Sequence, residues 1–245
     1  GVDARKKHSA HSMFASGSDP EKLIRKTAYD GLDLLPADES IRALDRQLGE
    51  LGKKKRIAKL AAGLGKNYDR IIFDCPPVLN ELSAQIIRAA DLVIVPLPPS
   101  PLSARAFEAV VEEVRGSGKG HPPILPVLSM LDLRRSLHKA ARDANPDWPV
   151  IPYSSAAEQC AVQRQPVGAF APGTPAAQAF AQGVAVQVHV GVQRAALVGH
   201  SWGALIGLEA AARLKERITH LVLVGVAYPM KVSPALLQAS IDEPE

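Results

Sequence analysis

Short apolar segments alternate with segments of helix length along most of this chain. The apolar segments, each predicted to be a buried strand, are Ile71–Asp74, Leu92–Val95, Ile124–Leu128 and Val150–Pro152. Parallel strands need crossover helices between them, and these helices cover both faces of the sheet. The alternation therefore predicts an α/β fold with a mostly parallel, doubly wound sheet and helices on both faces. A further short strand is expected at Gly31–Pro36.

Capping residues indicate where several helices begin. Asp19, Asp38 and Thr174 each precede a segment with helical character, because a short polar side chain can accept a hydrogen bond from the first turn. The basic run Lys53–Arg56 opens another amphipathic helix. The Ala-rich helix that follows Thr174 is expected to end at Ala181.

Composition excludes some classes of protein. An apolar content of 47% over 245 residues is enough for one large domain or for one and a half smaller ones. The two cysteines, Cys75 and Cys160, form no C-x-x-C pair, so a reduced, cytoplasmic protein is expected. No apolar run reaches the ~18 residues of a membrane span, and nothing resembles a signal peptide. We therefore expect no membrane partner.

The composition changes at Gln182–Gly183, which we take as a domain boundary. From Val184 to Val192 apolar and polar residues alternate with a period of two and show no helical phase. The expected domains are residues 1–182 and residues 183–245. The chain begins Gly1-Val2-Asp3 without methionine, so we expect that its start has been cut.

The segment Tyr68–Pro77 (YDRIIFDCPP) is an apolar strand that ends in an aspartate. A carboxylate at the end of a central strand can hold the water shell of Mg²⁺ beside a bound triphosphate. Asp74 stands in that position. The alternative is that Asp74 only caps the turn that follows the strand.

Residues 29–181 resemble the C-terminal three-quarters of the ParA/MinD-type partitioning ATPases, whose fold is P-loop-NTPase-like. The pieces that carry the resemblance, in the family's order, are Tyr29–Ala37 (YDGLDLLPA), Tyr68–Pro77, Ala90–Pro96 (ADLVIVP), Met130–His138 (MLDLRRSLH) and Pro166–Ala177. The resemblance implies that Asp74 is the Walker B aspartate, which binds Mg²⁺ through water next to ATP. It also implies a ParA-like homodimer and non-specific contact with DNA.

Arg134 and Arg135, or alternatively the run Lys53–Arg56, are candidates for the DNA contact, because phosphate contacts need only clustered cations. The alternative is that these arginines belong to a solvated helix face. No aromatic residues are interleaved with them to stack on bases.

The Gly-rich phosphate loop of that family is not found in this sequence. Two segments contain G-x-G-K, Gly63–Asn67 and Gly116–Gly120, but neither has Ser or Thr after the lysine. Both are predicted to be the C-terminal ends of helices. Because a triphosphate needs backbone amides that cradle it, we expect a truncated ATPase that binds neither ATP nor Mg²⁺ well and does not hydrolyse ATP.

Residues 192–204 (VQRAALVGHSWGA) are an apolar strand that runs into a G-x-S-x-G turn. From about residue 191 the chain resembles the α/β-hydrolases, which implies that Ser201 is the nucleophile by descent and that the backbone N–H of Trp202 belongs to an oxyanion hole. Only 44 residues follow Ser201, and their one histidine, His220, opens a predicted core strand. Since a serine needs a base and an orienting acid, Ser201 is expected to be inert.

Three readings of the whole chain therefore stay open. It can be a nucleotide- or DNA-binding ParA-like fragment, an esterase-like hydrolase fragment with an incomplete triad, or a chimeric, non-functional fusion or misassembled reading frame. The β-α-β unit of residues 195–226 is appended to or inserted into the sheet. We predict that Ala195–Val198 pairs parallel to Ile71–Phe73, in the place of the phosphate-loop strand, which would bring Ser201 near Asp74.

Overall fold

The computed structural model describes residues 19–37, 55–68, 71–75, 79–116, 118 and 120–189, and residues 183–189 by their backbone only. The helix predicted after Asp38 and the predicted pairing of residues 195–198 lie outside the described residues. So does the whole β-α-β unit at residues 195–226.

A parallel sheet of three strands forms the centre of the described part. Its order is β3 (Val93–Leu97), β4 (Ile124–Leu131) and β5 (Val150–Pro152), with Ile94 opposite Leu125 in the first pair. β5 has the predicted bounds, whereas β3 is shifted toward its carboxyl end and β4 continues three residues further than predicted. The prediction of a parallel α/β sheet is confirmed.

The extra residues of β4 contain an irregularity. The register between β4 and β5 shifts between Leu128 and Leu131, and Met130 has a φ of 56°. A non-glycine residue in the left-handed region is uncommon and is held there by its surroundings. The irregularity lies where β4 enters the loop that carries Arg134.

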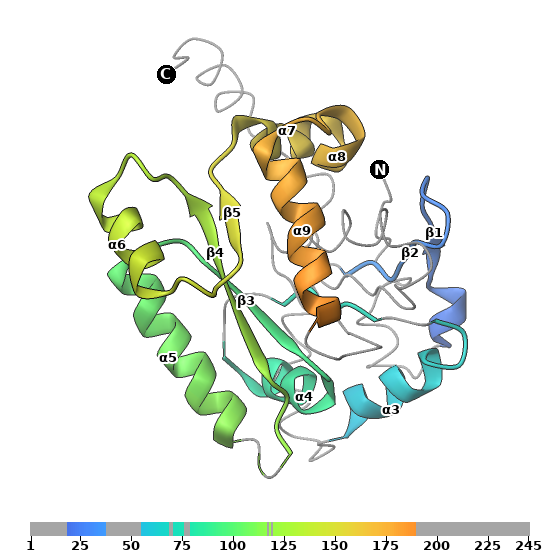
Figure 1. Cartoon of the computed structure of the whole chain (residues 1–245). Coiled ribbons are helices and arrows are strands. Elements are labelled where there is room, and N and C mark those ends of the chain that lie inside the picture. The colour runs from blue at the N-terminus through green and yellow to red at the C-terminus, as the bar shows by residue number, and fades with distance from the viewer. Residues whose placement is uncertain are drawn as a thin grey trace, which may run out of the picture.

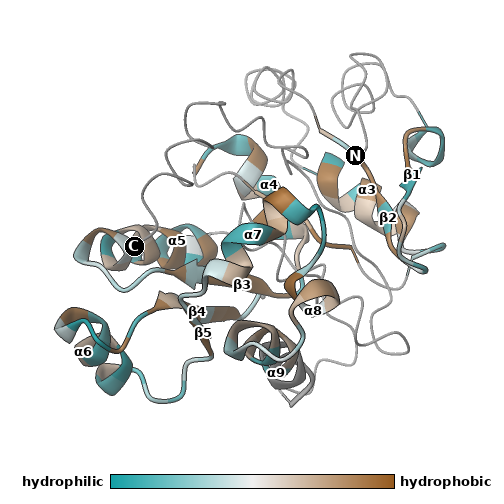
Figure 2. Ribbon diagram, turned by 90° about the horizontal axis from the view of Figure 1, so that it is seen from above, coloured by the Kyte–Doolittle hydropathy of each residue, from teal (hydrophilic) through white to brown (hydrophobic). Residues whose placement is uncertain are grey.

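Helices cover both faces of this sheet (Figure 1). On one face, α4 (Glu81–Ala89) and α5 (Pro101–Gly116) bury Val93 in a small cluster with Ile87 and Val114. On the other face lie α7 (Ser155–Gln163), α8 (Val167–Phe170) and α9 (Pro175–His189). Figure 2 shows the strands in hydrophobic colours at the centre and α6 (Ser136–Ala144), at the periphery, largely in hydrophilic ones.

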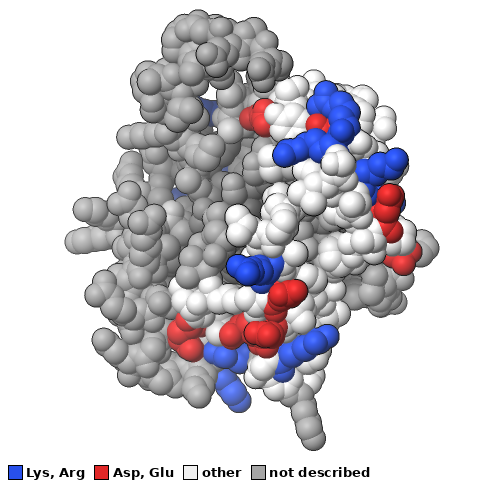
Figure 3. Space-filling view, turned by 90° about the vertical axis from the view of Figure 1, so that its left-hand side faces the viewer, with Lys and Arg blue, Asp and Glu red and all other residues white. Residues whose placement is uncertain are grey.

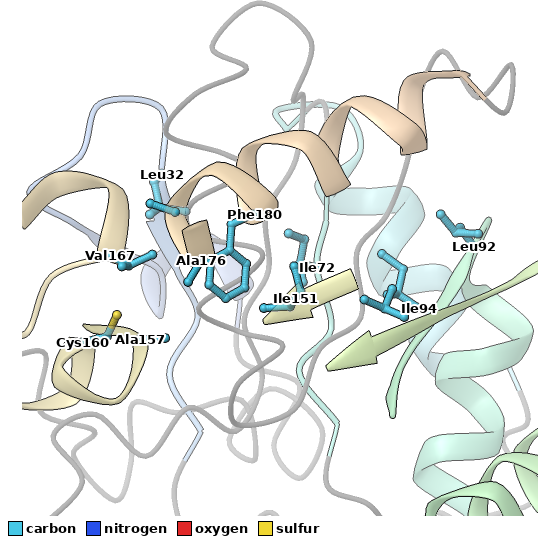
Figure 4. Close-up of a cluster of buried hydrophobic side chains, with 12 residues drawn as sticks. Leu32, Ile72, Leu92, Ile94, Ile151, Ala157, Cys160, Val167, Ala176 and Phe180 are labelled. Carbon is cyan, nitrogen blue, oxygen red and sulfur yellow. The ribbon is translucent and has the colours of Figure 1, made fainter. Parts of the chain in front are cut away.

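The larger core lies under α7, α8 and α9. Figure 4 shows Phe180 and Ala176 of α9 close to Ile72 and Ile151, which reach this core from the sheet side. Phe180 is 2% exposed. Because β strands alternate their side chains, Ile94 and Ile151 face α9 while Val93 faces α4.

The segment Ile71–Asp74 is buried but is not a strand of the described sheet. Its four residues are at most 7% exposed, yet it forms no ladder with a described strand. Ile71 and Phe73 pack in one cluster with α3 (Arg56–Leu64) and α4, and Ile72 packs in the other cluster under α9. The segment predicted to be a strand is therefore buried but does not pair with a described strand. An apolar pattern indicates which residues are buried, but it does not indicate which strand a segment hydrogen-bonds to.

A small antiparallel hairpin precedes this segment. β1 (Arg25–Lys26) pairs with β2 (Asp33–Leu34), so the strand expected at Gly31–Pro36 is shorter and β1 was not predicted. Gly31 turns the chain with a φ of 74°, a conformation that favours glycine. The expected helix after Asp19 is a single 3-10 turn, Pro20–Lys22, in which the Asp19 carboxylate accepts from the N–H of Glu21.

One buried acid ties the hairpin to the end of α3. The Asp33 carboxylate accepts hydrogen bonds from Lys26 Nζ and from the Tyr68 hydroxyl, each at 2.8 Å. Burial, and then the hydrogen bond to Asp33, raise the pKa of Tyr68 to about 12. Since the neutral phenol is the form that the fold favours, this stabilisation is complete below pH ~10 and is lost as the pH rises toward 12.

The last described helix corrects two expectations. α9 runs from Pro175 to His189, so it continues through the predicted boundary at Gln182–Gly183. The strand-like alternation expected from Val184 is wrong as far as His189. Thr174 does cap the helix, through a hydrogen bond from the N–H of Ala177, and the packed first turns propagate the helix beyond Ala181.

We expect Phe180→Ala to lower the free energy of unfolding by about 3–5 kcal/mol, because it leaves a cavity between α9 and the sheet. Val162→Ala is the matched control: Val162 lies on α7 and is 62% exposed, so its truncation should change stability by less than about 0.5 kcal/mol. Urea unfolding measures both. Equal small effects would contradict the packing of α9 as the cover of this core.

We expect Tyr68 to ionise late in an alkaline titration followed by ultraviolet absorbance, with a midpoint of about 12. Tyr68→Phe should remove that late step and leave the earlier ones. A variant whose absorbance curve keeps the step would show that Tyr68 is not held by Asp33.

Candidate functional site

Asp74 ends the buried segment that joins the two cores. Its side chain is fully buried, and Phe73 and Cys75 flank it. Burial, and then the charge of Asp74, raise the pKa of the Cys75 thiol well above its usual range. The structure thus places Asp74 at the end of an apolar, buried segment that is not a strand of the described sheet, and its role stays a prediction.

The helix that follows this segment begins at a well-formed cap. The Asn80 side chain accepts from the N–H of Ser83, and the Ser83 hydroxyl accepts from the N–H of Asn80, which is a capping box at the start of α4. One turn later, Gln85 is 1% exposed and donates to Glu81 Oε1 at 3.0 Å. Gln85 was not singled out from the sequence, because a glutamine on a helix carries no signal of burial.

The two G-x-G-K segments are helix ends, as predicted. Gly65 is the C-terminal cap of α3, and its N–H donates to the Ala61 carbonyl at 2.8 Å. The N–H groups of Lys66 and Asn67 likewise donate to carbonyls of α3. α5 ends at Gly116, where the other segment begins. Because the amides at the end of α3 are already bonded, the Gly63–Asn67 segment cannot cradle a phosphate.

The buried carboxylate of Asp74 suits Mg²⁺ better than other common metals. Mg²⁺ keeps several of its waters and is held by one or two carboxylates together with substrate phosphates. No group of three or more His, Cys, Asp or Glu side chains that could hold a metal is found among the described residues. Asp74 therefore fits the water shell of Mg²⁺ bound to a nucleotide, and it does not fit a protein-only metal centre.

Arg134 and Arg135 lie in the loop between β4 and α6, and their surroundings differ. Arg134 is bound by Asp132: its Nε and Nη2 donate to Oδ1 and Oδ2 at 2.9 and 2.8 Å. This pairing with Arg134 lowers the pKa of Asp132 to about 2. Arg135 is exposed and stands at the N-cap of α6.

Asp132 and His138 were not predicted as part of this site. The backbone N–H of Asp132 donates to Nδ1 of His138 at 3.0 Å, and the His138 side chain is 7% exposed. His138 therefore anchors the loop that carries the two arginines. The sequence offered a signal only in the charges of Asp132 and Arg134, two positions apart, which a short loop can bring together.

Ser201 and Trp202 lie outside the described residues. The structure places neither of them, so their roles as nucleophile and as oxyanion-hole residue stay predictions. Among the helices that the structure describes, none is long and apolar enough to cross a membrane.

Two family models match the chain. Residues 2–119 match a model described as an AAA domain, and residues 99–243 match one described as the alpha/beta hydrolase fold. The second match covers more than half of the chain, and the two ranges overlap over residues 99–119. Both families are those that the sequence resembles, in the same order.

Curated relatives match about half of this chain. The chromosome partitioning protein ParA of Caulobacter vibrioides is 34% identical over 126 residues, which are 48% of this chain and 47% of that protein. The sporulation initiation inhibitor protein Soj of Bacillus subtilis is 26% identical over 132 residues, 52% of either chain. The chain thus spans about half the length of the curated relatives it matches.

A solved structure has the same fold. The cell division ATPase MinD of Pyrococcus furiosus superposes with a TM-score of 0.56 at 19% identity, covering 74% of this chain and 75% of that one. This likeness confirms the predicted P-loop-NTPase-like α/β fold.

Proposed function

This chain belongs to the α/β-hydrolase fold family, whose model matches residues 99–243. We propose that the part of the chain that matches an AAA-domain model and resembles the partitioning ATPases is a ParA/MinD-type partitioning-ATPase module. In this module Asp74 serves as the Walker B aspartate. The observation that carries the proposal is the complete burial of Asp74 at the end of an apolar segment. An aspartate that only caps a turn at the surface is usually exposed, whereas Asp74 is carried into the core.

The residues around Asp74 suit this role. Mg²⁺ bound with ATP supplies charge neutralisation for the transferred phosphoryl group. Asp74 would accept hydrogen bonds from water of the metal's shell. Ile72 and Phe73, at most 2% exposed, exclude solvent on either side of the segment and keep the carboxylate in place.

ATP hydrolysis needs backbone amides that bind the phosphates as well as a carboxylate that directs Mg²⁺. The amides of the Gly63–Asn67 segment are bonded to α3, and Gly116–Gly120 follows the end of α5. We propose that this chain keeps the magnesium-directing residue without the phosphate loop, so that it does not hydrolyse ATP by itself.

We expect phosphate release from ATP and Mg²⁺ to stay at background for the intact chain and for Asp74→Ala alike, because Asp74 alone cannot position a γ-phosphate. A phosphate-release assay over a range of ATP concentrations measures this. A steady rate that Asp74→Ala abolishes would mean that the chain has a phosphate site that neither G-x-G-K segment supplies.

We propose duplex DNA, bound without sequence preference, as the partner of the surface that carries Arg134 and Arg135, and a second copy of the chain as a further partner. Two observations support this proposal: both arginines are exposed, and the Caulobacter relative is a chromosome partitioning protein. Contacts of this kind go to phosphates and weaken steeply with salt.

The α/β-hydrolase match favours a second function, an esterase-like activity centred on Ser201. It rests on the G-x-S-x-G sequence at residues 199–203 and on the family match over residues 99–243. The third reading, a non-functional fusion, is supported if a folded sample neither binds DNA nor lets Ser201 react with a fluorophosphonate probe.

We expect Ser201→Ala to leave the hydrolysis of p-nitrophenyl acetate unchanged, since no histidine and acid are placed in sequence to activate the serine. Initial rates of the intact chain and the variant give the comparison. A tenfold loss would correspond to about 1.4 kcal/mol of transition-state stabilisation and would show that another base activates Ser201.

A further inference from the structure

The guanidinium of Arg134 is already bound by a carboxylate of its own loop. Asp132 accepts two side-chain hydrogen bonds from Arg134 and, through Oδ1, a third from its backbone N–H at 3.0 Å. The Arg134 side chain is 85% exposed, so this pair lies where a polyanion can reach it. Figure 3 shows Lys and Arg side chains spread from the top to the bottom of one face, with acidic side chains between them.

The rest of the loop fixes Asp132 in this position. Its N–H is bonded to His138, its carbonyl accepts from the N–H of Arg135 at 3.1 Å, and the Leu131 carbonyl before it accepts from the N–H of Tyr153 at 2.9 Å. The carboxylate is therefore held in place by the backbone, and it is the flexible arginine that closes onto it.

Arg135, unlike Arg134, is not paired with a carboxylate of its loop. Its side chain is exposed, and it takes part in none of the ion pairs found among the described residues. Two neighbouring arginines that look equivalent in the sequence thus differ in the structure: one is neutralised by an internal acid, and the other is open to a partner.

We propose that Asp132 is an intramolecular competitor of phosphate, which weakens anion binding through Arg134 and leaves Arg135 as the main contact. The proposal rests on the DNA contact proposed above and adds its regulation. A guanidinium fork fits a carboxylate and a phosphate in the same bidentate way, so a DNA phosphate must displace Asp132 to bind Arg134. While the pair is closed, Arg134 neutralises no phosphate and releases no counterion.

The competitor stays charged over the whole range in which DNA binding is measured. Because the pKa of Asp132 lies at about 2, mild acid does not protonate it. Substitution of the acid, and not a change of pH, is therefore the way to release Arg134.

The test is Asp132→Asn in the full chain, with affinity for a labelled duplex measured by fluorescence anisotropy at several salt concentrations. Asparagine keeps an oxygen that can accept the N–H of Arg134, so the loop is preserved while the charge is removed. We expect binding to tighten by about threefold or more and the slope of log K against log salt to steepen by about 0.9, which is one further phosphate contact. Asp132→Asn/Arg134→Ala should lose the gain.

Glu81→Gln is the matched control. Glu81 pairs with Arg88 on α4 through Oε1 at 3.1 Å, so this variant also removes one negative charge beside an arginine and adds the same net charge to the chain. It should bind DNA as the unsubstituted chain does. If Glu81→Gln tightens binding as much as Asp132→Asn, the effect comes from net charge and the proposal is wrong.

A further comparison, with Arg135→Ala and with heparin, distinguishes failure of this proposal from failure of the proposed DNA contact. If the unsubstituted chain and Arg135→Ala bind the duplex equally or not at all, the DNA contact is wrong. The salt needed to elute each protein from heparin, a polyanion of another kind, then still decides the role of Asp132. Later elution of Asp132→Asn supports the competitor, and unchanged elution of a folded Asp132→Asn overturns it.

Discussion

The burial of Ile71–Asp74 between two cores is the interaction on which the rest of this structure depends. Ile72 packs toward α9, while Ile71 and Phe73 pack toward α3 and α4. A side-chain cluster on each side of one extended segment holds the layers of the fold together, and each fully buried side chain contributes roughly 1.5–3 kcal/mol. The carboxylate of Asp74 is carried inside with them, at the place where the apolar segment ends.

Packing alone does not explain why a polar group is found at such depth. Apolar neighbours would favour another apolar residue at position 74, and a buried carboxylate lowers stability unless something compensates it. A buried acid of this kind is typical of a functional site. The charges in the loop after β4 lie at the surface, where Asp132 neutralises Arg134. The position of Asp132 therefore decides that Arg135, and not Arg134, is available to bind an anion.

Much of the fold follows from the sequence, and the exceptions have physical reasons. β5 lies where its apolar residues predicted it, and Gly65 caps α3 as the G-x-G-K pattern suggested. The alternation of apolar and polar residues at Val184–His189 wrongly predicted a strand. A helix that is already packed at Ala176 and Phe180 continues through residues that have only a weak helix preference. The pairing of Arg134 with Asp132 was not predicted, since a cation's availability depends on side-chain geometry and not on its place in a motif.

The stability of Asp74→Asn tests the central claim most directly. If Asp74 is kept for magnesium and nucleotide and not for the fold, the free energy of unfolding of Asp74→Asn in urea should be unchanged or higher than that of the unsubstituted chain. If Asp74 instead holds the fold together as a structural cap, the same substitution should lower that free energy. A loss of more than about 2 kcal/mol would contradict the account.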